Sequence, residues 1–193
     1  MIRYGILVLS YNGSTGKGRK VMELFDAIYK RTSYRGEYTS EKVPYEDLEK
    51  IAEAGMAAPS GCNLQTTSFY IVDDEALVIG IAGLLMSPAV KTAPALIVAA
   101  MNTGLTDDFT FEKEDCAAAV ENMLLAITAL GYASCWIDGE LLYEQKAEKI
   151  SRILNMPEEQ TPRVLLPVGK PASGCGRKPK LPFEQRTTHN KHE

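Results

Sequence analysis

Residues 58–65 read Ala58-Pro59-Ser60-Gly61-Cys62-Asn63-Leu64-Gln65 and separate a clear helical pattern from a clear strand pattern. Proline, glycine, serine and asparagine favour tight turns and offer several hydrogen-bonding groups. Because loops held between rigid elements often carry function, this stretch is a candidate to bind a flat polar ring through backbone N–H groups and two amide side chains. An ordinary helix-to-strand connection has the same composition, so the loop alone leaves both interpretations open.

The residues on either side of this loop predict a helix and a strand. Pro44 stands where the helix begins, and the helix must end before Pro59, because the residue that precedes a proline avoids helical backbone angles. The apolar residues between them recur at helical spacing and are Leu48, Ile51, Ala52, Gly55 and Met56. Residues 67–72 contain aromatic and β-branched side chains and are followed by two aspartates, which predicts a strand.

Further helices and strands alternate through the rest of the chain. Helical patterns cover residues 22–31, 75–85, 112–130 and 140–154. Residues 95–101 form a continuous apolar run that predicts a buried central strand. Short strands are expected at 133–137 and 163–169, the latter at a sheet edge or a bulge because it contains Pro167.

The composition is that of one globular domain. The chain has 193 residues, of which 45% are hydrophobic, and a net charge of −4. An acidic chain is not expected to bind nucleic acid or an anionic membrane surface broadly, and no apolar run is long enough to span a bilayer. We therefore expect neither nucleic acid nor a membrane as a partner. Residues 22–193 are assigned to a single domain, and residues 1–21 to an N-terminal extension of uncertain role.

The cysteines and histidines argue against a metal centre. Cys62, Cys116, Cys135 and Cys175 form no C-x-x-C pair, and both histidines lie in the C-terminal tail. A zinc site is therefore not expected, and a chain of this length needs no disulfide framework. This cysteine usage is typical of a reducing compartment, so we expect a cytoplasmic protein.

Two clusters of basic residues are candidates to bind an anion. The first cluster is the segment Arg31-Thr32-Ser33-Tyr34-Arg35. It combines two guanidinium groups with hydroxyl groups that can donate hydrogen bonds to an anionic ligand. The second cluster contains Arg177, Lys178 and Lys180. A solvated helix end and a solvated tail are the plain alternatives, and each cluster alone leaves the choice open. The chain shows no nucleophile–base pair, paired carboxylates or metal cluster, which favours an anionic cofactor that carries the chemistry itself.

These motifs resemble those of the FMN-dependent nitroreductases in order and spacing. Residues 31–35 resemble the family's R-x-S-x-[RK] opening, and residues 58–65 resemble its A-P-S-x-x-N-x-Q loop. Residues 122–131 resemble the N-x-x-L-x-A-x-x-x-G helix end, and 136–139 the flavin-edge segment that follows it. Residues 155–158 and 164–169 resemble the late turn and strand, and Arg177-Lys178 the C-terminal basic pair. The resemblance runs from about residue 22 to about residue 182.

The resemblance implies an α+β fold, with a mixed, mainly antiparallel sheet between helical layers in a three-layer α/β/α arrangement, and an intertwined homodimer with FMN at the subunit interface. The residues that it implies at the cofactor are Arg31, Thr32, Ser33, Arg35, Pro59, Ser60, Gly61, Asn63, Gln65, Ile137, Asp138, Gly139, Arg177 and Lys178. Arg31, Ser33, Arg177 and Lys178 would hold the phosphate, and Arg35 would lie near the flavin N1 and O2 edge. The loop would line the ring, and the other subunit would bring the backbone of Asp138 and Gly139 to the N5 and O4 edge.

The implied activity is an NAD(P)H-dependent oxidoreductase that reduces nitroaromatics, quinones or related small-molecule acceptors by a ping-pong hydride mechanism. No side chain is required as acid or base, since the flavin carries the chemistry and Arg35 tunes it. The alternative is a flavin-binding or flavin-sensing protein with little turnover. Thr66-Thr67 follow Gln65 where many members have Pro-Trp, and the chain is short for the family, which suggests a reduced lid.

Overall fold

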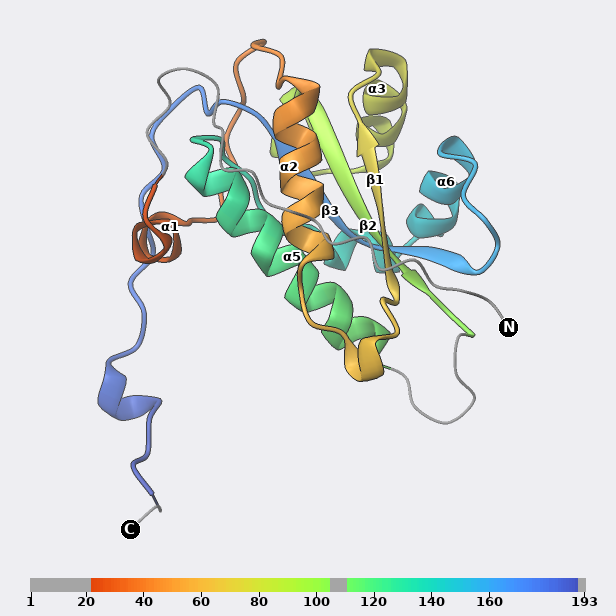
Figure 1. Ribbon diagram of the computed structural model, residues 1–193. Helices are drawn as coiled ribbons and strands as arrows, with labels where there is room; N and C mark the ends of the chain where they lie inside the picture. Colours follow the sequence, from red (N-terminus) through yellow and green to blue (C-terminus); the bar gives the residue numbers. More distant parts are fainter. Residues whose placement is uncertain (1–21, 105–110, 191–193) are drawn as a thin grey trace.

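A computed structural model describes residues 22–104 and 111–190 of the chain. A three-stranded antiparallel sheet lies between two layers of helices (Figure 1). This arrangement confirms the predicted α+β fold with a mainly antiparallel sheet between helical layers. The predicted extension, residues 1–21, lies outside the described residues. Within the described ranges no helix is both long enough and apolar enough to cross a membrane.

The sheet has the strand order β1-β2-β3, with β1 at Thr67–Val72, β2 at Ala95–Asn102 and β3 at Gln160–Val168. Strand β2 is central, and its first six residues are buried, as the apolar run predicts. Ala95 pairs with Val168 at one end of the β2–β3 ladder. Successive side chains of a strand point to opposite faces, so both faces of β2 need a helical cover.

One face of the sheet is covered by helix α2 (Tyr45–Met56) and the long helix α5 (Glu112–Ala129) (Figure 1). The buried side chains on this face include Leu48, Ile51, Ile97, Met123, Ile127 and Leu166. The other face is covered by α3 (Glu75–Leu84), α4 (Pro88–Thr92) and α6 (Lys146–Ile153). Its buried side chains include Ile81, Val90, Leu96, Val98, Ile150 and Leu165. The three layers are thus built from two separate apolar clusters.

The long helix α5 ends where the sequence predicts. Gly131 adopts a φ of 75°, and its N–H bonds the carbonyl of Thr128 at 2.9 Å. The N–H of Tyr132 bonds the carbonyl of Ile127, also at 2.9 Å. This pair of hydrogen bonds is the Schellman motif, which favours glycine at the left-handed position.

Helix α1 (Leu24–Lys30) is shorter than the predicted 22–31 and buries little of its apolar surface. Leu24, Phe25 and Tyr29 are 63%, 68% and 60% exposed, and Ala27 is its buried residue. Burial of such side chains is favourable, so the open face of α1 is a candidate contact surface for another chain.

The strand predicted at 133–137 forms only isolated bridges to the outer edge of β3. Ala133 pairs with Gly169 and Ile137 pairs with Leu165, which in one antiparallel register would set Cys135 opposite Pro167. A regular ladder there needs an N–H that proline lacks. The carbonyl of Pro167 instead accepts a hydrogen bond of 3.3 Å from the hydroxyl of Tyr38. The prediction of a continuous strand was therefore wrong because of a single residue on its neighbour.

The helix predicted at 140–154 is two elements. A 3₁₀ helix, η2, covers Gly139–Leu142, and α6 begins only at Lys146, after Glu144 and Gln145 with φ of 55° and 53°. Leu141 and Ile150 both lie in the same apolar cluster. Nine residues make two and a half helical turns, so an unbroken helix would set these two side chains on opposite faces. The break lets both reach the core.

Candidate functional site

The loop at residues 58–65 has an unusual backbone conformation. It contains a short 3₁₀ helix, η1, at Gly61–Asn63, and three of its non-glycine residues adopt positive φ. These are Cys62, Asn63 and Gln65, with φ of 51°, 55° and 54°. A left-handed backbone is costly for residues with a Cβ and persists where surrounding contacts hold it.

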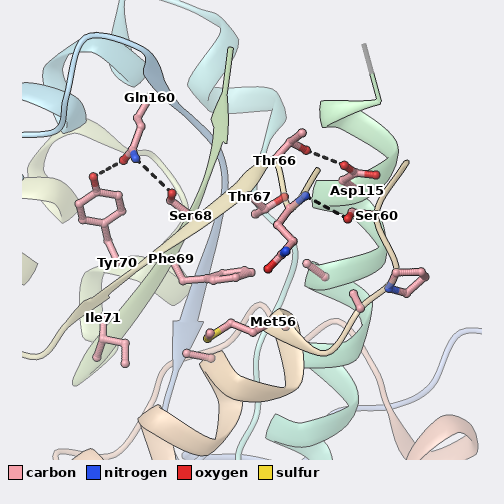
Figure 2. Close-up of a pocket in the computed structure, with 16 residues that line it drawn as sticks. Met56, Ser60, Thr66, Thr67, Ser68, Phe69, Tyr70, Ile71, Asp115 and Gln160 are labelled. Atoms are coloured by element: carbon pink, nitrogen blue, oxygen red, sulfur yellow. Dashed lines mark hydrogen bonds between the residues drawn. The ribbon is translucent and has the colours of Figure 1, made fainter. Parts of the chain in front are cut away.

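Asp115, in the first turn of α5, provides such contacts. Its carboxylate accepts a hydrogen bond of 2.8 Å from the N–H of Gly61 and one of 2.6 Å from the hydroxyl of Thr66. The hydroxyl of Ser60 accepts a further bond of 3.0 Å from the N–H of Gln65 (Figure 2). Asp115 is 6% exposed, and hydrogen bonds to a buried carboxylate are among the stronger ones in proteins. One buried carboxylate therefore holds the middle of the loop and the residue that follows it.

Phe111 packs directly against the loop from the residue before α5. A Cβ added to Gly61 would clash with Cβ, Cγ and Cδ2 of Phe111. Such a contact is impossible without movement, so Gly61 is required by close approach.

A pocket of about 520 Å³ opens beside this loop, between the end of α2, strand β1 and the start of α5 (Figure 2). The loop residues that line it include Pro59, Ser60 and Gln65. Strand β1 lines it with both apolar and polar side chains, and the side chain of Gln160 forms hydrogen bonds with two of the polar ones, Tyr70 and Ser68. A cavity with an apolar floor and a few fixed polar groups is typical of a small-molecule site.

The first basic segment lies against the segment that follows α5. The N–H of Tyr34 bonds the carbonyl of Ser134 at 2.8 Å, and Ser33 and Ser134 form a parallel bridge. Arg31 forms an ion pair of 3.2 Å with Glu121 of α5. Arg31 is thus held partly buried beside the second half of α5.

The C-terminal segment reaches the same place. The N–H of Ala172 bonds the carbonyl of Glu37 at 2.9 Å, and Sγ of Cys175 lies 3.8 Å from the carbonyl of Ser33. Arg177 and Lys178 follow Cys175 closely and are exposed. The structure therefore brings together the neighbourhoods of the two basic clusters, which the sequence separates by more than a hundred residues.

A small pocket of about 70 Å³ lies between the start of the first basic segment, the end of α5 and the segment that follows it. Its lining residues with polar side chains are Lys30, Arg31, Thr32, Thr128, Tyr132 and Ser134. The hydroxyl of Ser134 is buried and, within the described part of the chain, has no hydrogen-bond partner. Cationic groups beside an unsatisfied hydroxyl suit a phosphate, so the residues present fit the phosphate end of FMN.

The predicted flavin-edge segment runs along β3. Ile137 exchanges two backbone hydrogen bonds with Leu165, of 3.1 and 2.8 Å. Asp138 forms an ion pair of 3.5 Å with Arg163. Gly139 is exposed, and a Cβ added there would meet nothing within 4 Å, so its backbone is open to a ligand.

Arg35 is exposed, with Nη1 3.4 Å from the carbonyl of Ser33. Its charge also reaches the buried thiol of Cys135. Burial raises the pKa of Cys135 to about 11, and the Arg35 guanidinium opposes that shift. Arg35 therefore lies at the surface end of the basic segment, near Cys135 in the segment after α5.

One chain does not gather all the predicted residues. The loop at 58–65 is bound to Asp115 near the start of α5, whereas Arg31 shares a pocket with Thr128 near its end. At 1.5 Å per residue, Asp115 and Thr128 are about 20 Å apart along the helix axis. The loop and the basic clusters thus lie near opposite ends of α5.

Sequence reasoning missed Asp115, Ser134 and Arg163. Asp115 stands among acidic residues at a helix start, where they are ordinary, and Ser134 and Arg163 lie within strand-like runs. Their importance comes from partners distant in sequence, which no local pattern signals.

Comparisons with known proteins identify relatives of this chain. The nitroreductase family model matches residues 28–87 and 81–170. A protein of Methanothermobacter thermautotrophicus, provisionally named NADH dehydrogenase/NAD(P)H nitroreductase, is 32% identical over 156 residues, which are 80% of this chain and 81% of that protein.

Two solved structures share the fold. One, from Bacteroides thetaiotaomicron and provisionally given the same name, has a TM-score of 0.78 and 27% identity, over 88% of this chain and 98% of that one. The other, a provisionally named nitroreductase from Desulfovibrio desulfuricans in complex with FMN, has a TM-score of 0.76 and 25% identity, over 90% of this chain and 100% of that one.

The comparisons confirm the class predicted from the motifs, an NAD(P)H-dependent oxidoreductase with FMN as its cofactor. The chain belongs to the nitroreductase family.

Proposed function

We propose that this protein takes electrons from NADH or NADPH and passes them to small-molecule acceptors such as nitroaromatics or quinones, in a ping-pong reaction. When bound, FMN supplies the hydride chemistry. The observation that carries the proposal is the junction of the two basic clusters beside the unsatisfied hydroxyl of Ser134. A phosphate-bearing cofactor gives this junction a purpose that a solvated tail does not.

The chain's own residues bind and orient the cofactor. Arg31, Ser33, Arg177 and Lys178 hold its phosphate through charge-assisted hydrogen bonds. The rigid loop at 58–65 lines the ring, and Arg35 supplies positive charge where the reduced ring becomes negative. Position and electrostatics, rather than proton transfer by a side chain, are the protein's contribution.

The site is completed by a second copy of the chain. Ser33 is bridged to Ser134 within one chain, and residues 134–138 extend from there by about 13 Å along β3. The family resemblance implied that the backbone of Asp138 and Gly139 reaches the flavin from the other subunit. The geometry favours a different division, in which one protomer supplies the basic clusters with residues 137–139 and its partner supplies the loop at 58–65.

The test is spectroscopic. Freshly purified protein, or protein reloaded with FMN, should show a flavin spectrum that NADH or NADPH bleaches rapidly without oxygen. A nitroaromatic or a quinone should then restore it. Failure to bind FMN refutes the proposal, whereas stoichiometric FMN that neither donor bleaches supports the flavin-binding or sensing alternative.

A further inference from the structure

Arg163 occupies a β-bulge in the middle of strand β3. Ala99 of β2 pairs with Val164 and Ala100 pairs with Pro162, so Arg163 is an extra residue without a partner on β2. A bulge bends its strand and redirects the side chain of the extra residue, and bulges are frequent next to active sites. The redirected side chain here is cationic and lies beside the predicted flavin-edge segment.

The Arg163 guanidinium contacts the segment through Asp138. Nη2 lies 3.5 Å from Oδ2 of Asp138, and the two side chains are 25% and 36% exposed. Nη1 is buried and has no hydrogen-bond partner among the described residues. A guanidinium nitrogen that is buried without a hydrogen-bond partner is costly for folding alone, which argues for a role outside the core.

The segment is anchored on two further sides. Ile137 is bonded to Leu165, and the N–H of Met86 donates a hydrogen bond of 2.6 Å to the carboxylate of Glu140. Between these anchors the backbone of Gly139 is open. Arg163 thus acts on the one exposed turn of an otherwise fixed segment.

We propose that Arg163 is a positioning residue that holds Asp138 and neutralises its charge beside the flavin. The inference rests on the proposed function, in which residues 137–139 face the N5 and O4 edge. An uncompensated carboxylate there would disfavour the anionic reduced cofactor, because like charges repel each other at short range. The paired guanidinium removes that penalty and also fixes the turn.

The test is a double-mutant cycle on the redox potential of the FMN-loaded protein, with Arg163→Met, Asp138→Asn and the double variant. Arg163→Met should weaken binding of reduced FMN roughly three- to tenfold more than binding of oxidised FMN, which lowers the two-electron potential by roughly 15–30 mV. Asp138→Asn should raise the potential, and the double variant should return close to the wild-type value. Arg152→Met, an exposed arginine on α6, is the matched control and should not shift the potential.

An unchanged potential in Arg163→Met would overturn the proposal, and so would a double variant that keeps the lowered potential of Arg163→Met instead of returning close to the wild-type value. If Arg163→Met folds poorly, Arg163→Lys provides the second measurement, since it keeps the charge and should keep most of the potential. A wild-type protein that fails to bind FMN or to be reduced by NAD(P)H would instead contradict the proposed function. Failure of the proposed function can therefore be distinguished from failure of the proposal for Arg163.

Discussion

Single residues distant in sequence fix the candidate site, and Asp115 is the clearest case. Replacing it with alanine leaves the N–H of Gly61 and the hydroxyl of Thr66 without their acceptor. We expect Asp115→Ala to lower the free energy of unfolding by roughly 2–3 kcal/mol and to weaken FMN binding. Asp115→Asn should recover part of both, because an amide oxygen still accepts from Gly61. Urea unfolding and FMN titration measure the effects.

The matched control for Asp115 is Glu114→Ala, an exposed carboxylate in the same helical turn. Equal stability of Asp115→Ala and this control would show that the loop does not depend on the buried carboxylate.

Arg35 and Arg31 should differ in what they do to the flavin. A fixed guanidinium near N1 and O2 stabilises the reduced cofactor more than the oxidised one. Loss of about 1–3 kcal/mol of this preference in Arg35→Ala would lower the two-electron potential by roughly 20–65 mV. Arg35→Lys should recover part of it. Arg31→Ala should instead weaken FMN binding without moving the potential of bound flavin, and spectroelectrochemistry on loaded protein would separate the two.

The four cysteines should divide by burial. Burial raises the pKa of Cys116 and of Cys135 to about 11, while Cys62 and Cys175 are exposed. At pH 8 only about one in a thousand buried thiols is then the reactive thiolate. Iodoacetamide at pH 8 should label Cys62 and Cys175 in the folded protein and leave the buried pair unlabelled, as read by mass spectrometry. Rapid native labelling of Cys135 would contradict this.

Much of the candidate site could be predicted because its motifs are local. Each motif can be recognised from a few consecutive residues, as in the loop at 58–65 and the clusters at 31–35 and 177–178. Asp115 and Arg163 could not be predicted, since their roles depend on a loop closure and on a strand register. Those are set by tertiary contacts rather than by neighbours in the chain.

At the scale of elements, the contact between the loop and the start of α5 depends most on the size of the side chain at position 61. Gly61→Ala should drive Cβ into the Phe111 ring and weaken FMN binding about tenfold, whereas a second change, Phe111→Ala, should restore most of the affinity. Gly80→Ala is the control, because a Cβ there meets only an ordinary contact of 3.9 Å. Fluorescence titration with FMN gives the affinities, and no recovery in the double variant would refute the steric explanation.

Helices and strands could be predicted from the spacing of apolar residues wherever tertiary contacts did not override the local pattern. Helices α2 and α5 and strands β1 and β2 lie where their apolar spacing places them. The two failures, at 133–137 and 140–154, arose where a neighbouring proline or a shared core overrode the local pattern. The local sequence shows neither effect, because one depends on the register that would set Pro167 opposite Cys135 and the other on the packing of Leu141 and Ile150 in one cluster.

At the scale of the whole molecule, the exposed face of α1 and the separated half-sites predict an obligate dimer. Light scattering should give twice the chain mass of 21.2 kDa, and interfaces of this kind usually bury more than about 2,000 Å². Phe25→Glu should split the dimer and release FMN. Ile79→Glu, an equally exposed apolar position on α3, should do neither. A monomer that retains stoichiometric FMN would rule the dimer out.

The pairing of Ala95 with Val168 has a consequence for biosynthesis. Strand β2 emerges from the ribosome long before β3. Closing the chain between these two strands costs conformational entropy before their pairing stabilises the sheet. Until then β2 exposes one bare edge of a continuous apolar segment, the kind of intermediate that associates wrongly at high concentration. Slower translation or chaperone supply after residue 102 should therefore raise the soluble yield, and a chain stopped before β3 should be recovered as aggregate.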